Sequence, residues 1–160
     1  MSDRMMMLTL TRIEVSHLRD LVAQFTDLVN GTPSDDPALE RLTPDVYPDD
    51  EDASREFRSI TRGDLLHRRA RDAQLVRQGL DSVMSAPGDD ELRPVDIALD
   101  AEAIDPWLRT LTALRLVIAT RLGIETEDDH DPEDPRFAVL DWLGYRLDGL
   151  VQAADSFQEE

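Results

Sequence analysis

Two arginines in the most apolar segment of the chain are the residues whose types and positions first suggest chemistry. Arg115 and Arg121 fall inside the apolar arc of a helix predicted over residues 105–124, when successive residues are placed about 100° apart. An Arg held among apolar side chains needs a carboxylate partner, because an unpaired buried charge is prohibitively costly. Three acidic residues are candidate partners: Asp141, Asp148 and Glu14. We therefore predict a buried ion-pair network. The alternative is an anion-binding pocket formed by the two guanidinium groups, in a metal- or anion-dependent enzyme that also uses nearby carboxylates.

A second face of the last predicted helix combines small and aromatic side chains: Ala138, Trp142, Tyr145 and Gly149. Such a face suits a protein partner or a second copy of the chain, because Trp and Tyr are enriched at interfaces. The alternative is that this helix is covered on both sides and that the face packs internally.

The third long helix carries a modestly basic face, formed by His67, Arg68 and Arg71. We interpret it as a solvated face that lies opposite acidic loops of the same chain. Nucleic-acid binding is the remote alternative.

No pattern in the sequence predicts a catalytic or metal-ligating residue. The acidic stretch 128–134 contains His130, but it has no glycine where a calcium loop needs its turn, so it reads as a solvated loop. There is no HExxH pair, no Gly-x-Ser-x-Gly elbow and no glycine-rich phosphate loop. We predict no cofactor, and an enzyme is the less favoured class.

Charge and composition exclude further classes. The 160 residues include 35 acidic and 17 basic ones, which gives a net charge of −18. This acidity repels nucleic acids and anionic membranes. The absence of Cys excludes disulfides, thiolate nucleophiles and thiol redox switching. No secretory signal is visible, and the arginines of segment 105–124 would be costly in lipid. We expect a single cytoplasmic domain over residues 1–160.

Periodicity predicts the elements that position these residues. A capping box at Thr11 and Glu14 begins the first helix, which Gly31 ends. Asp105, Pro106 and Gly123 are start and stop signals of the apolar helix. The remaining predicted helices are a short one capped by Asp36, a turn or two near residues 57–60, one from Thr61 to about residue 86, and one from Asp134 to about Phe157.

Short strands are predicted at residues 5–10 and 95–99, and each is followed by a helix cap, so we expect the two to pair as a ribbon lying against the helices. The predicted fold is all-α. Five or six helices pack around the central apolar helix 105–124, with at most a minor two-stranded ribbon.

One segment resembles the hallmark of a known family. Residues Trp107 to Ile124 read WLRTLTALRLVIATRLGI, which is similar to the central motif of an actinobacterial family labelled a domain of unknown function. Shorter stretches around Asp36–Pro44, Glu56–Arg58 and Asp141–Gly144 are also similar. The resemblance implies a role as an oxidative-stress regulator of the AosR type, encoded beside the Clp-protease adaptor. It brings no catalytic residues, and the lack of Cys departs from any thiol-based version of that role.

These observations favour a non-enzymatic regulator or adaptor that acts through protein contacts. The partner is an unidentified protein, and a homodimer is a further possibility. Direct binding of nucleic acid or membrane is not expected.

Overall fold

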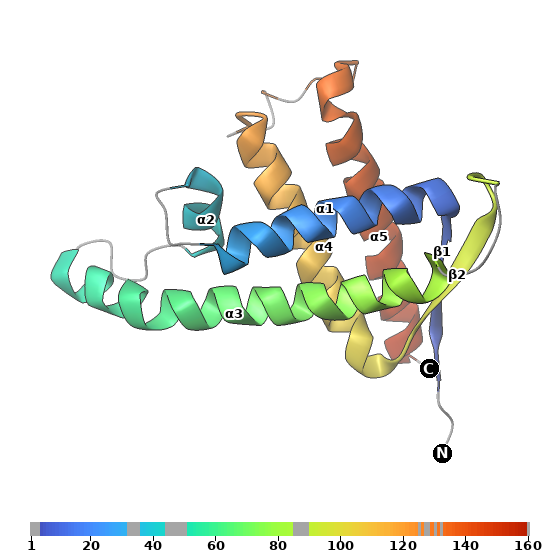
Figure 1. The fold of residues 1–160 in the computed structure, drawn as a ribbon, viewed down its shortest axis with the longest axis horizontal. Coiled ribbons are helices and arrows are strands. Elements are labelled where there is room, and N and C mark those ends of the chain that lie inside the picture. Colours follow the sequence, from blue (N-terminus) through green and yellow to red (C-terminus); the bar gives the residue numbers. More distant parts are fainter. Residues whose placement is uncertain are drawn as a thin grey trace.

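The chain forms long helices and one short ribbon (Figure 1). The computed structural model describes residues 4–31, 36–43, 51–84, 90–124, 126, 129, 131 and 133–159; of 51–61 and 159 it describes the backbone alone. The elements are β1 (Met6–Thr11), α1 (Arg12–Asn30), α2 (Pro37–Leu42), α3 (Glu51–Met84), β2 (Pro94–Leu99), α4 (Ala101–Arg121), the 3-10 turn η2 (Pro135–Phe137) and α5 (Ala138–Glu159). The predicted class, mostly helical with a minor two-stranded ribbon, is confirmed.

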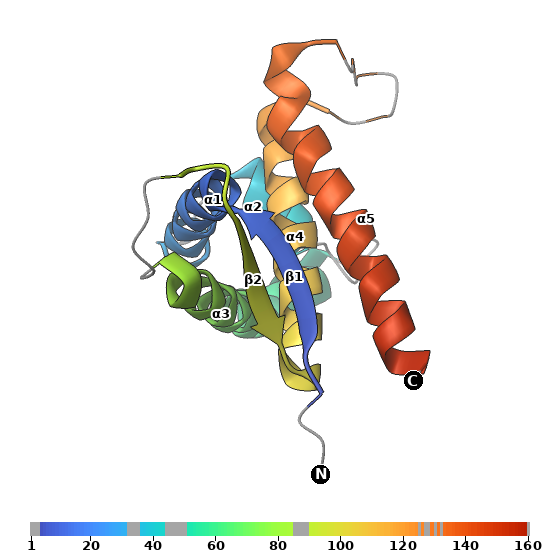
Figure 2. The same cartoon turned by 90° about the vertical axis from the view of Figure 1, so that its right-hand side faces the viewer.

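The long helices form two layers that cross steeply. Helices α1 and α3 lie side by side and run in opposite directions, while α4 and α5 cross behind them in Figure 1. Seen from the side, α4 lies between the α1–α3 pair and α5, and the ribbon covers one end of the molecule (Figure 2). Helix α4 contacts α1, α2, α3 and α5, which confirms its predicted central place. No helix in the described part of the chain is both long enough and apolar enough to cross a lipid bilayer.

The two strands pair antiparallel, with Met6 opposite Leu99 and Thr11 opposite Pro94. Their inward-facing side chains are apolar and join the core of the molecule: Met6, Leu8, Leu10, Val95, Ile97 and Leu99. Such a ribbon is only marginally stable alone, so this apolar face against the helices is what holds it. The ribbon leads directly into α1 and α4, and it thereby fixes where both helices begin.

Trp107 anchors the centre of the core. Its side chain is 1% exposed and lies between the helical layers. On α3, Gly79 makes room for the ring, because a Cβ atom there would lie 3.0 Å from Cζ2 of Trp107. A glycine in a helix interior costs about 1 kcal/mol relative to Ala, and here it allows the two helices to approach around the indole.

The predicted capping box of α1 is confirmed, but the predicted start of α4 is wrong. Asp100, the predicted helix cap after the second strand, caps α4 by accepting a hydrogen bond from the Ala103 amide at 2.9 Å, so the helix begins there and not at Asp105. The helix therefore continues through Pro106, which lies buried. A proline there removes one backbone hydrogen bond, and burial of the ring against the core offsets part of this cost.

Helix α3 also differs from the prediction, because it is one helix of 34 residues rather than a short helix followed by a new one at Thr61. Gly63 lies within it and is exposed, with open space around it. Polar residues and a glycine imitate a helix start, but a glycine inside a helix costs only about 1 kcal/mol relative to Ala and does not end it. In Figure 1 the first turns of α3 extend beyond α2.

Both ends of the segment joining α4 to α5 follow the predicted signals. Gly123 has φ +76°, its amide donates to the Thr120 carbonyl, and the Ile124 amide donates to the Ala119 carbonyl at 2.9 Å. This is the hydrogen-bond pattern of a Schellman motif. Asp134 caps the 3-10 turn that leads into α5. On α5, the apolar residue Val151 is 41% exposed.

Candidate functional site

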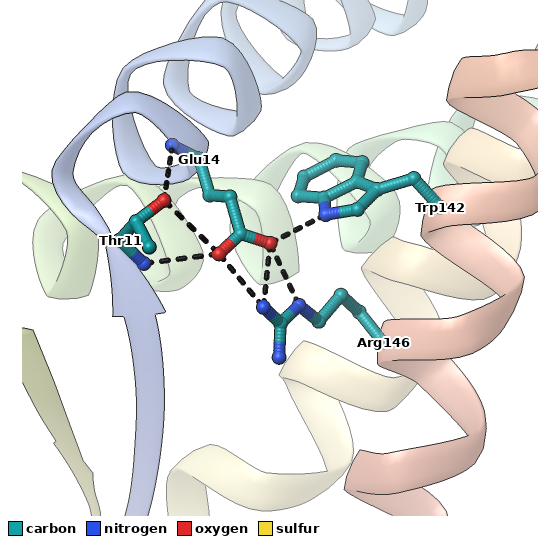
Figure 3. Close-up of polar contacts among 4 residues, drawn as sticks. All are labelled: Thr11, Glu14, Trp142 and Arg146. Carbon is teal, nitrogen blue, oxygen red and sulfur yellow. Dashed lines mark hydrogen bonds and ion pairs between the residues drawn. The ribbon is translucent and has the colours of Figure 1, made fainter. Parts of the chain in front are cut away.

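The strongest polar cluster joins the first turn of α1 to α5 (Figure 3). The Glu14 carboxylate accepts hydrogen bonds from the Thr11 amide at 3.0 Å and the Thr11 hydroxyl at 3.1 Å. It also accepts one from Nε1 of Trp142 at 2.5 Å and two from Arg146, at 2.8 and 2.7 Å. A capping-box residue thus also connects two helices that are far apart in the sequence.

These contacts determine the ionisation of Glu14. Burial alone raises the pKa of its carboxyl, but hydrogen bonds from Thr11, Trp142 and Arg146, together with the charge of Arg146, lower that pKa from 4.5 to about 2. A carboxylate with so low a pKa and with both oxygens occupied is a poor proton acceptor near neutral pH. Glu14 therefore fixes α5 and the Trp142 indole to α1.

The prediction that Glu14 pairs with one of the two arginines of the apolar helix is wrong, because its partner is Arg146. Arg121 instead forms a two-bond ion pair with Asp36, both distances being 2.7 Å. The Arg121 side chain is 50% exposed, so the pair lies at the surface. The hydrogen bonds from Arg121 lower the pKa of Asp36, which also caps α2. This ion pair holds α2 against the end of α4.

Arg115 is exposed as well, which contradicts the predicted buried network. It lines a cleft of about 820 Å³ between α4 and α5, together with Arg41 and Asp141. Its guanidinium lies over Gly144, where a Cβ atom would be only 3.2 Å from Nε. Asp148 is exposed elsewhere on α5. The two arginines therefore do not share a site.

The reason for this error is the position of α4 in the fold. All its buried residues lie between Ile104 and Leu114. Beyond them no residue of the helix is fully buried, although three apolar residues still pack against the core: Leu116, Val117 and Ile118. Figure 1 shows the last turns of α4 projecting past α1 together with the first turns of α5. The prediction placed the whole helix inside the core, whereas its second half is only partly covered, by α2 at Arg121 and by α5 at Arg115.

The predicted partner surface on α5 is mainly open to solvent. Ala138 and Gly149 are exposed, and Tyr145 is 71% exposed. Trp142 is half-buried because its ring edge reaches Glu14. The alternative of a fully internal face does not hold for the other three residues.

Beside this face, α1 and α5 enclose a shallow groove of about 460 Å³, which we call the α1–α5 groove. Its lining is mostly apolar, with polar groups from α1 at the rim: Ile13, Glu14, His17, Asp20, Leu21, Ala138, Val139 and Trp142. Val139 is 45% exposed, so apolar surface is open there. Sequence reasoning missed this groove because its two walls, on α1 and α5, are far apart in the sequence.

The predicted basic face of α3 is present, with His67, Arg68 and Arg71 all exposed. The structure adds Arg69 and Arg109, which line one hollow with Arg68 and Arg71. Arg109 comes from α4, so the wheel of a single helix could not have placed it there.

Within the described part of the chain, no group of three or more acidic or histidine side chains is placed to hold a metal ion. Of the acidic loop considered in the sequence, Asp128 and His130 lie outside the described residues.

The chain matches the model of one protein family. The match covers residues 2–154, and the family is described as a domain of unknown function, DUF2017. Since this is nearly the whole sequence, the chain belongs to that family. No curated protein and no solved structure matches the chain.

Proposed function

We propose that this DUF2017 protein is a non-enzymatic adaptor or regulator that binds a partner protein in the α1–α5 groove. The observation that carries the proposal is that the Trp142 side chain is held in place beside an open apolar surface. Its Nε1 is held by Glu14, while the apolar surface beside its ring is open. An aromatic side chain already held in place loses little conformational freedom on binding, and such residues dominate interface energetics.

The surroundings of Trp142 extend the apolar contact surface. Val139 lines the α1–α5 groove, and Tyr145, about one helical turn beyond Trp142 on α5, has most of its side chain in solvent. Large exposed apolar side chains that cluster beside an aromatic residue mark interaction surfaces more often than scattered ones do.

Charge indicates the kind of partner. Asp20 lies at the rim of the groove, and the chain as a whole carries a net charge of −18. A partner with complementary charge is attracted at long range, whereas an acidic one is repelled. The partner that fits best is an amphipathic helix with an apolar face for the groove and basic residues along its edges.

The test uses two valines on α5 with similar exposure. Val139→Asp places a charge in the groove, whereas Val151→Asp places the same charge on α5 outside it, at a residue that is 41% exposed. The wild-type chain and both variants serve as baits in a lysate of the native host, and bound proteins are quantified by mass spectrometry. We expect a protein that wild type and Val151→Asp retain and Val139→Asp loses.

Equal capture by all three baits, or by none, contradicts the proposal. Size-exclusion chromatography with light scattering on the same proteins tests the homodimer. If the wild-type chain is a dimer and only Val139→Asp dissociates it, the occupant of the groove is a second copy of the chain.

The resemblance to AosR-type regulators supports a regulatory role within this proposal. Because the chain contains no Cys, such regulation would proceed through partner exchange rather than thiol chemistry. The competing enzyme hypothesis relies on Arg115 and Arg121 acting together. The Arg121–Asp36 ion pair leaves Arg115 as the one member of that pair of arginines that lines the α4–α5 cleft.

A further inference from the structure

A second feature, outside the α1–α5 groove, is a hollow between α3 and α4 that concentrates positive charge. It has a volume of about 450 Å³. We call it the arginine hollow, and the described residues that line it are four arginines, one acid and two leucines: Arg68, Arg69, Arg71, Arg109, Asp72, Leu65 and Leu75. In a chain with twice as many acids as bases, four arginines around one acid are a marked local excess.

The single acid is already engaged by the other helix. Arg109 donates two hydrogen bonds to Asp72, at 2.9 and 3.2 Å, and these bonds raise the pKa of Arg109. Among the described residues, Arg68, Arg69 and Arg71 therefore share one hollow with no carboxylate ion-paired to any of them.

Two observations indicate that stability of the fold does not explain this cluster. Like charges three residues apart on a helix repel each other, as Arg68 and Arg71 do. In addition, Nε of Arg69 is shielded from solvent and has no hydrogen-bond partner among the described residues. A buried donor without an acceptor is unfavourable. An anion in the hollow would relieve the repulsion between the guanidinium groups.

We propose that the arginine hollow binds a compact phosphorylated ligand. Guanidinium groups present paired donors that match the oxygens of a phosphate group. The volume exceeds that of phosphate alone, and Leu65 and Leu75 provide apolar contacts, so the ligand carries an organic body. The acidity of the rest of the chain opposes an extended polyanion such as nucleic acid, which would lie over much more of the surface.

The experiment measures binding to the full chain by isothermal titration calorimetry at low ionic strength. The probes are inorganic pyrophosphate and a phosphoserine peptide with aliphatic flanking residues, so that a free phosphate compound and a phosphorylated protein can be distinguished. The double variant Arg68→Gln, Arg71→Gln tests the site. Arg77→Gln is the matched control, because Arg77 lies on α3 and does not line the hollow.

We expect saturable binding of at least one probe, weakened about tenfold or more by the double variant and less than about twofold by Arg77→Gln, since charge-assisted hydrogen bonds are lost only in the former. Preference for one probe identifies the source of the phosphate. The proposal is overturned if the probes give heats no larger than those of sodium chloride at equal ionic strength. It is also overturned if the double variant and Arg77→Gln weaken probe binding equally. Val139→Asp should leave this binding unchanged, so the outcome is independent of the α1–α5 groove.

Discussion

Replacing Glu14 with Gln tests whether its carboxylate joins α1 to α5 as the structure indicates. The pKa of Glu14 is about 2 in the fold, against 4.5 for an unperturbed glutamate. Since one pH unit corresponds to about 1.4 kcal/mol, this difference represents about 3 kcal/mol in favour of the charged, folded form. The side chains of Glu14 and Arg146 are 16% and 29% exposed. Solvent screening therefore lowers the expected loss on Glu14→Gln to about 2 kcal/mol, or about 4–8 °C in Tm for a chain of this length.

The pH dependence gives this prediction its sign. Because the folded pKa lies below the unfolded one, the contribution of Glu14 is fully present above about pH 5 and is lost as the pH falls from 4.5 toward 2. Urea unfolding followed by circular dichroism should show the full difference between wild type and Glu14→Gln at about pH 7. The two proteins should converge at about pH 2.

Two further variants separate this cause from general damage to α5. Trp142→Phe removes one donor to Glu14 and keeps most of the ring, so we expect a loss of about 1 kcal/mol. Asp148→Asn removes an exposed carboxylate of the same helix and should change the free energy of unfolding by less than about 0.5 kcal/mol. A Glu14→Gln effect that stays constant down to about pH 2, or one no larger than that of Asp148→Asn, refutes the reasoning.

Four other substitutions test the packing and the ion pairs. Gly79→Ala places a Cβ atom 3.0 Å from Trp107, and we expect thermal unfolding to show a net loss of about 1–2 kcal/mol, the clash outweighing the gain in helix propensity. In Gly123→Ala the added Cβ atom has no neighbour within 4 Å, but the alanine must adopt φ +76°. Chemical denaturation should therefore show a loss of about 1 kcal/mol in the free energy of unfolding. Arg121→Leu removes an exposed two-bond ion pair and should cost about 1 kcal/mol or less, whereas Arg115→Leu should leave Tm within about 1 °C of wild type. A large loss for Arg115→Leu would restore the buried ion pair that the sequence predicted.

The elements with strong local signals were predictable from the sequence. The capping box at Thr11, the alternation at residues 95–99 and the glycine at position 123 each specify a backbone geometry through short-range sterics and hydrogen bonds. The structure places a helix start, a strand and a Schellman motif there. Local signals did not decide every boundary: α4 continues through Pro106, which is buried in the core, and α3 continues through the exposed Gly63.

The pairing of charged residues was not predictable, because it depends on which helices approach each other. The position of Asp36 at the start of a helix is already explained by its role as a cap. The residues next to it in the sequence do not indicate that Arg121, 85 residues away, also binds it. Glu14 likewise had a local role, and its contact with Arg146 spans 132 residues. Periodicity places a residue on a face of its helix, but it does not identify the neighbour of that face.

Ionic strength separates the two proposed sites. With a net charge of −18, the chain attracts a basic partner and repels a phosphate ligand at long range. The screening length falls from about 30 Å at 0.01 M salt to about 10 Å at 0.1 M. Association of a basic helix with the α1–α5 groove should therefore slow as salt rises, which stopped-flow fluorescence of Trp142 can follow.

For the arginine hollow, salt weakens the contacts but also removes the long-range repulsion, so pyrophosphate affinity by calorimetry should change less over the same range. If both interactions weaken equally, long-range charge does not discriminate between the two ligands, and short-range contacts alone must account for their selectivity.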